Sequence, residues 1–172
     1  MGVEGENEGS DTAVPEELGR LRLLFQKDGE LNKEHELLKA TGGGHIDVVR
    51  FLVNDCGADV NTKDKYGPTA VMFAAEGGHI DVVRFLVNEC GAEVNKKDKE
   101  GESAVMYAAG GGHIDVVRFL VNDCGADVNT KDKYGPTAVM KAAGGGHIDV
   151  VQFLVNECGT EVNKKDKEGE SA

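Results

Sequence analysis

One block of sequence, GGHIDVVRFLVN and its close copies, recurs four times along the chain at a spacing of 34 residues. Each copy places one histidine and one cysteine at the same position: His45, His79, His113 and His147, and Cys56, Cys90, Cys124 and Cys158. A period of about 20 to 50 residues is typical of repeat proteins, in which a single unit is too small to bury its own apolar face. We therefore expect an array of stacked units that complete one another's core.

Charge and hydropathy limit the partners of this array. The 172 residues carry a formal net charge of −12, which disfavours general binding to nucleic acid or to an anionic membrane. No apolar run approaches the ~18 residues of a membrane span, and the first residues, MGVEGENEGSD, lack the basic and apolar parts of a signal peptide. We expect a soluble protein of the cytoplasm or the nucleus.

Each repeat predicts two helices. Thr69 is suited to be the N-cap of a short first helix through about Glu76, with its hydroxyl accepting a hydrogen bond from a free backbone N–H. A second helix is expected from about His79 to Cys90, with Gly91 after its end, where glycine permits a positive φ. The equivalent N-caps of the later copies are Ser103 and Thr137. The polar segment between helix pairs, built around Asp-Lys-x-Gly, is expected to protrude as a turn or finger.

Three motifs together resemble the ankyrin repeat. They are Gly-His at the start of the second helix, GADVN after that helix, and D-K-x-G-x-T before a first helix that ends in AA. The resemblance covers about residues 30 to 172 and implies an all-α ankyrin-repeat solenoid of stacked helix-turn-helix units with protruding finger turns. Two departures stand out. The TPLH of the family becomes TAVM or SAVM, which removes a proline and a histidine that forms a hydrogen bond in family members. The repeat also has one residue more than the usual ~33, near NDC or NEC.

The domain organisation follows from the repeat boundaries. Residues 1–14 are expected to be a disordered acidic tail, and residues 15–30 an N-terminal capping helix with leucines on one face. Residues 31–172 hold about four repeats and a truncated one at the C-terminus. A longer period of 68 residues is also present, because DVNTKDKYGPTAVM and EVNKKDKEGESA alternate. Recent duplication or engineering from modules would both produce it.

The resemblance implies that a partner binds to the fingers and to the exposed side of the first helices. On that basis we expect the partner-binding residues to be Lys39, Lys65, Tyr66, Phe73, Lys99, Glu100, Tyr107, Lys133, Tyr134 and Lys141. Phe73 and Tyr107 could instead pack against the next first helix, and the finger lysines could instead serve only solubility. Those lysines are Lys63, Lys65, Lys96, Lys97, Lys99, Lys131, Lys133, Lys164, Lys165 and Lys167.

The sequence predicts no catalytic, metal-binding or cofactor-binding site. The glycine runs lack the pattern of a phosphate-binding loop and are interpreted as helix ends. The cysteines recur too far apart for disulfides between stacked helices. Each histidine is interpreted as a structural hydrogen-bonding group at a helix start. We expect no catalytic residues, no metal and no cofactor.

The leading hypothesis is therefore a non-catalytic, monomeric scaffold for another protein, one with an acidic surface. A second hypothesis is a sensor for a phosphorylated nucleotide, because the TAVM-type repeats are similar to those of the 2-5A-dependent endoribonuclease family. The aromatic residue that stacks on a base in that family is replaced here, at Pro68, Glu102, Pro136 and Glu170. A third is an engineered or purely structural array.

Overall fold

The computed structural model describes residues 16, 18–20, 22, 23 and 32–160. The chain divides into two units, Met1–Leu31 and Asn32–Ala172. In the first unit the described residues are helical, within the range expected for a capping helix. The acidic tail, the remainder of that helix and the truncated repeat at 161–172 lie outside the described residues and stay predictions.

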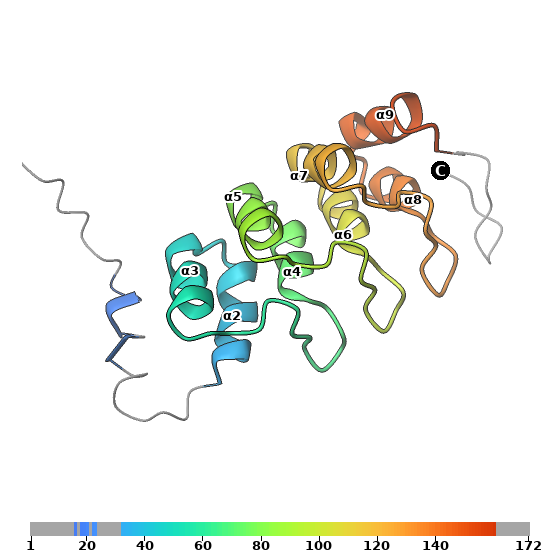
Figure 1. The fold of residues 1–172 in the computed structure, drawn as a ribbon. Coiled ribbons are helices and arrows are strands. Elements are labelled where there is room, and N and C mark those ends of the chain that lie inside the picture. Colours follow the sequence, from blue (N-terminus) through green and yellow to red (C-terminus); the bar gives the residue numbers. More distant parts are fainter. Residues whose placement is uncertain (1–15, 17, 21, 24–31, 161–172) are drawn as a thin grey trace, which may run out of the picture. The chain divides into compact units, whose positions relative to one another are not determined.

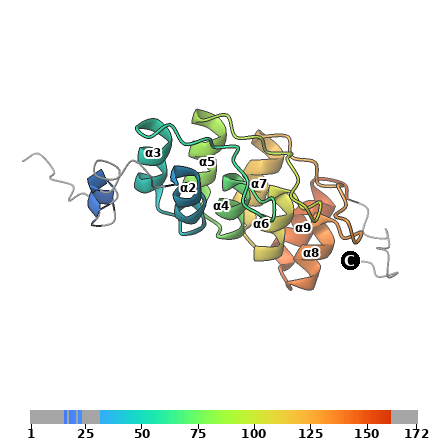
Figure 2. The ribbon, with the colours of Figure 1, turned by 90° about the horizontal axis from the view of Figure 1, so that it is seen from below.

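The second unit is a stack of helix pairs, and the predicted all-α solenoid is confirmed. The pairs are α2 (Lys33–Gly42) with α3 (Ile46–Asn54), α4 (Ala70–Glu76) with α5 (Ile80–Arg84) and η1 (Phe85–Glu89), α6 (Ala104–Gly111) with α7 (Ile114–Arg118) and η2 (Phe119–Asp123), and α8 (Ala138–Gly144) with α9 (Ile148–Asn156). The first helices pack on one another in one layer and the second helices form another (Figures 1 and 2). Within residues 32–160 there is no strand beyond an isolated bridge between Lys63 and Thr69.

Small and branched side chains form the core between the layers. Ala74 and Ala75 of α4 and Ala108 and Ala109 of α6 are fully buried, which allows neighbouring first helices to pack closely. The apolar faces of the second helices cover them, and their buried residues include Leu52, Leu86, Leu120, Phe153 and Leu154. Each repeat thus supplies part of the core of the next repeat, as the 34-residue period predicts.

The starts of the first helices are predicted correctly, but the cap hydrogen bonds are not. Thr69, Ser103 and Thr137 are the N-caps of α4, α6 and α8. The buried hydroxyl groups of Ser103 and Thr137 have no hydrogen-bond partner among the described residues, which contradicts the expectation that they accept from the helix, whereas Thr69 and Met72 form a capping box at the start of α4. The backbone N–H of Thr69 donates instead to Sδ of Met72 at 3.3 Å. The methionine that replaces the family's histidine thus accepts a hydrogen bond from the backbone of the N-cap residue.

The extra residue of the repeat lies within the second helix. In the two middle repeats the last turn widens into the π-helical segments η1 and η2, whereas α3 and α9 remain α-helical to Asn54 and Asn156. A π-helical turn holds about one more residue than an α-helical turn, so it accommodates the extra residue in these two repeats. Gly91 follows with a φ of 71°, which confirms the predicted glycine at the helix end.

Histidines connect each repeat to the one before it. Nε2 of His113 lies 2.8 Å from the carbonyl oxygen of Glu76 at the end of α4. His79 and His147 make the same contact to Gly42 and Gly110 at 3.0 and 2.9 Å. A side chain at Gly78 would lie 2.4 Å from the ring of His113, and its φ is 71°, so glycine is needed there for both reasons. The structural interpretation is confirmed for His79, His113 and His147.

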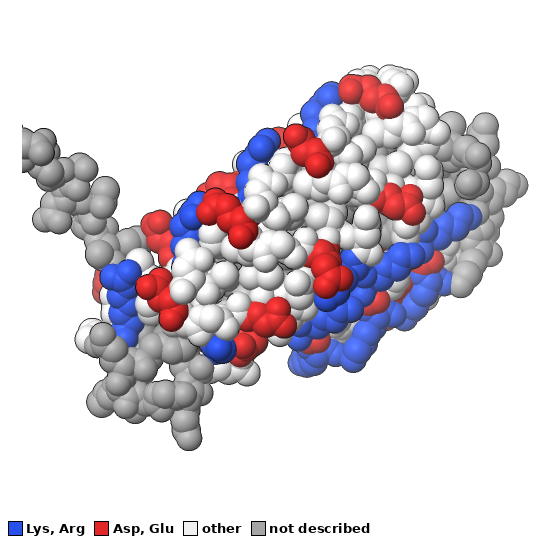
Figure 3. All heavy atoms as spheres, in the orientation of Figure 1, with Lys and Arg blue, Asp and Glu red and all other residues white. Residues whose placement is uncertain are grey.

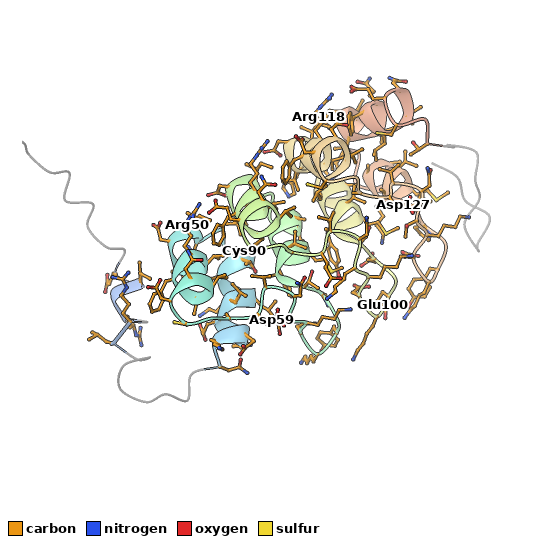
Figure 4. The ribbon with its side chains drawn as sticks, in the orientation of Figure 1. Arg50, Asp59, Cys90, Glu100, Arg118 and Asp127 are labelled. Carbon is orange, nitrogen blue, oxygen red and sulfur yellow. The ribbon has the colours of Figure 1, made fainter. Side chains whose placement is uncertain are left out.

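The alternation of the repeats has a counterpart on the outer surface of the second helices. Arg50 forms two hydrogen bonds with Glu89 of the next repeat at 3.1 and 3.0 Å, and Arg118 does the same with Glu157 (Figure 4). In the repeat between them the equivalent residues are Arg84 and Asp123, whose side chain is one methylene group shorter than that of glutamate, and these two form no ion pair among the described side chains. All three arginines lie over a phenylalanine ring of the following repeat, at 4.2 to 4.4 Å from its centroid.

Candidate protein-binding face

Three fingers project from the same side of the stack, and they pack on one another. We define finger 1 as residues 61–68, finger 2 as 95–102 and finger 3 as 129–136 (Figure 1). The backbone N–H of Lys99 donates to the carbonyl oxygen of Tyr66 at 3.3 Å, and that of Lys133 to the carbonyl oxygen of Glu100 at 2.8 Å. A side chain at Gly67 would lie 2.8 Å from the backbone nitrogen of Lys99, so the fingers approach closely only because glycine is there.

One aspartate shapes the turn of each finger. Oδ1 of Asp64 accepts from the backbone N–H groups of Tyr66 and Gly67 at 2.7 and 2.8 Å. Asp98 and Asp132 occupy the same place in fingers 2 and 3 and also accept two backbone N–H groups each. The Asp-Lys-x-Gly motif is thus a structural turn motif. The second carboxylate oxygen of each aspartate is left for another donor.

The finger lysines form a basic band along one edge of the molecule (Figure 3). Nζ of Lys63 donates to the carbonyl oxygen of Lys97 at 2.9 Å, and Nζ of Lys99 donates to that of Lys65 at 2.6 Å. These ammonium groups therefore join neighbouring fingers, and this observation supports a structural role for them. The finger lysines Lys164, Lys165 and Lys167 lie outside the described residues.

The finger tips alternate between tyrosine and glutamate. Tyr66 and Tyr134 are 64% and 57% exposed, and the ammonium groups of Lys65 and Lys133 lie over their rings at 4.7 and 4.8 Å. Glu100, at the tip between them, forms an ion pair with Lys133. This hydrogen bond lowers the pKa of the Glu100 carboxyl and raises the pKa of Lys133. Figure 4 labels Glu100 at the outer end of finger 2.

The four predicted first-helix residues lie in four different environments. Lys39 is exposed and Phe73 is half-buried. The hydroxyl of Tyr107 donates to Oδ2 of Asp98 at 2.8 Å. The pKa of the tyrosine is raised, mainly by its burial and secondly by the hydrogen bond to this carboxylate. Lys39 and Phe73 thus lie beside finger 1, and Tyr107 contacts finger 2.

The fourth first-helix residue, Lys141, is held by two carboxylates. It forms ion pairs with Glu102 and with Asp132, the latter at 3.1 Å from Nζ to Oδ2. Burial alone would lower the pKa of Lys141, but the hydrogen bonds to the two carboxylates outweigh it and raise the pKa. The sequence reasoning missed both carboxylates as partners. The signal that could have found them is their constant spacing before the first-helix position.

A hollow of about 650 Å³ opens at the first repeat, between α2 and finger 1. Two acidic residues, Glu34 and Asp64, line it together with apolar and other residues, among them Leu38, Lys39, Gly42 and Phe73. Phe73 and Lys39 were expected at a binding face, whereas the hollow itself and its carboxylates were not. A pocket that combines an aromatic side chain with a few polar groups is typical of a binding site.

No other site chemistry is visible among residues 32–160 and the described part of the first unit. No three histidine, cysteine or acidic side chains there are close enough together to hold a metal ion. The four cysteines are free, and burial raises the pKa of each thiol. No helix within the described residues is long and apolar enough to cross a membrane.

The stacked helix pairs and the fingers between them define a helical repeat protein. The sequence model for ankyrin repeats (three copies) matches residues 17–98 and 90–166, which is most of the chain. The chain belongs to the ankyrin-repeat family, whose repeats generally serve as protein-interaction modules. A search of curated proteins found none that matches the sequence.

Proposed function

We propose that this protein is a non-catalytic scaffold that binds a partner protein along the face made by the fingers and the first helices. The observation that carries the proposal is the exposure of Tyr66 and Tyr134 at the finger tips. Apart from them, Ile148 is the only exposed large hydrophobic side chain among residues 32–160. Exposed aromatic side chains are enriched at interfaces, where they contribute much of the binding energy.

The charge of the face favours a partner with acidic groups. Finger lysines form the basic band in Figure 3, although the protein as a whole is acidic. Such a charge pattern steers an acidic partner toward the fingers and weakens with added salt. A monomeric, soluble scaffold inside the cell fits this proposal.

Affinity capture from a cell lysate tests the proposal. The bait is the full chain, compared with a Tyr66→Ala/Tyr134→Ala variant. Ile148→Ala is the matched control, because Ile148 is 70% exposed but lies at the start of α9 and not on a finger. We expect a protein that is recovered with the wild type and with the control but lost from the double variant. Equal recovery with all three baits would contradict the assignment of the fingers.

The phosphorylated-nucleotide sensor is less well supported as an alternative. The hollow holds an aromatic ring with lysines nearby, but Glu34 and Asp64 also line it, and their carboxylates repel phosphate. A structural or engineered array is the remaining alternative. Reversible, cooperative melting together with no captured protein would favour it.

A further inference from the structure

Two of the repeats satisfy the free oxygen of the finger aspartate with a side chain of their own. In the third repeat Asp98 Oδ2 accepts from the hydroxyl of Tyr107 at 2.8 Å, nine residues later in the chain. In the fourth repeat Asp132 Oδ2 receives the ammonium group of Lys141, also nine residues later, at 3.1 Å. A donor on the first helix thus meets the aspartate of the finger before it.

The charge of the donor on the first helix matches the number of carboxylates around it in the third and fourth repeats. Lys141 also pairs with Glu102, 39 residues before it, so two carboxylates hold one cation. The residue 39 positions before Tyr107 is Pro68, so one carboxylate there meets a neutral hydroxyl. The number of carboxylates therefore accounts for a neutral donor at Tyr107 and a cationic one at Lys141.

The second repeat has the two carboxylates but no donor. Glu34 and Asp64 precede Phe73 by the same 39 and nine residues that separate Glu102 and Asp132 from Lys141. Both carboxyl groups line the hollow together with Phe73. Phenylalanine has no hydrogen to donate. Among the described residues no side chain donates a hydrogen bond to Glu34 or Asp64.

The lysines beside the hollow do not replace the missing donor. The ammonium group of Lys63 is bound to the carbonyl oxygen of Lys97, and that of Lys65 lies over the ring of Tyr66. Lys39 is exposed and forms no ion pair within the described part of the chain. The hollow is thus lined by Glu34 and Asp64, the residues at the spacings from Phe73 that elsewhere place two carboxylates around an ammonium group.

We propose that this hollow binds a lysine side chain of the partner protein. Its ammonium group lies between Glu34 and Asp64, as that of Lys141 lies between Glu102 and Asp132, and its methylene groups pack on Phe73 and Leu38. The ring of Phe73 adds a favourable contact to the cation. The inference rests on the proposed function, since it assigns one contact of the same partner. It predicts a lysine within a partner surface that is otherwise acidic.

A titration with a lysine analogue tests the site without the partner. The probe is Nα-acetyl-lysine N-methylamide, added to the ¹⁵N-labelled full chain and followed by NMR. We expect saturable shifts of the amides of residues 34, 64 and 73 at millimolar concentrations. Nα-acetyl-norleucine N-methylamide has the same stem without the charge, and it should bind about twofold to fivefold more weakly, as expected for loss of a partly exposed ion pair.

Three variants connect the signal to the acidic pair. Glu34→Gln/Asp64→Asn keeps the oxygen that Tyr66 and Gly67 need but removes both charges, so the lysine probe should lose its advantage over norleucine. Glu102→Gln is the matched control, because Lys141 already occupies its site, and it should leave binding of the probe unchanged. Phe73→Lys should fill the hollow from within and abolish binding.

The outcomes separate the two proposals. Absence of saturable shifts, or equal binding of the two probes, would overturn the lysine site even if a partner is captured through the finger tips. Charge-dependent binding of the probe at residues 34, 64 and 73 would support the site. It would do so even if the capture experiment contradicted the finger tips.

Discussion

Replacing Ser103 with alanine should stabilise the protein, although Ser103 is a helix N-cap. Loss of a capping serine ordinarily costs about 0.5 to 2 kcal/mol, because a backbone N–H loses its partner. Here the side chain of Ser103 makes no cap hydrogen bond, and the residue is only 4% exposed. A buried hydroxyl without a partner carries a desolvation cost of about 1 to 3 kcal/mol. Alanine removes that cost, so we expect a gain of about 1 kcal/mol.

Urea unfolding followed by circular dichroism measures this change. With a slope of about 2 kcal/mol per M, the unfolding midpoint should rise by about 0.5 M. Asn32→Ala is the control, since Asn32 Oδ1 accepts from the backbone N–H of His35 at 3.0 Å, and its loss should lower the midpoint by a similar amount. Met106→His should also stabilise the wild type by giving the hydroxyl of Ser103 a partner, and should not do so in the alanine variant. A fall in the midpoint for Ser103→Ala as large as that for Asn32→Ala would refute the reasoning.

Three further predictions concern contacts within and between repeats. Gly112→Ala should cost about 3 kcal/mol, against about 1 for Gly125→Ala. Both have positive φ, but only at Gly112 would the new atom lie 2.4 Å from the histidine ring of the next repeat; chemical denaturation compares them. Asp123→Glu should add about 0.5 kcal/mol by reaching Arg84, and the gain should disappear in high salt. In the folded chain the pKa of Tyr107 is raised above its unfolded value near 10, mainly by burial and secondly by the hydrogen bond to Asp98. The tyrosine therefore contributes stability that is complete below pH 10 and lost at higher pH, and Tyr107→Phe should flatten the fall in thermal stability above pH 10.

The sequence alone was sufficient for the repeat, the helix pairs and the residues that end them. Glycine at Gly91 and histidine at His113 have local or periodic reasons that can be read from one repeat and its copies. The same holds for the fingers, because Asp-Lys-x-Gly is a turn motif within a few residues of chain. These features depend on backbone preferences and on a period, both of which are properties of the sequence.

The partner of each side chain was decided by the tertiary structure. The hydroxyl of Ser103 is at a capping position, yet it is buried without a donor. The ammonium group of Lys99 binds a carbonyl oxygen of the preceding finger, and that of Lys141 binds two carboxylates from different fingers. Such contacts depend on where one repeat lies on the next.

The hollow beside Phe73 shows this limit most clearly. The sequence marks Phe73 as a surface position, but the acidic pair around it is formed by residues nine and 39 positions away. Packing of the repeats places all three residues in the wall of one hollow. Periodicity fixes which residues are equivalent, whereas only the distances between stacked units fix which of them interact.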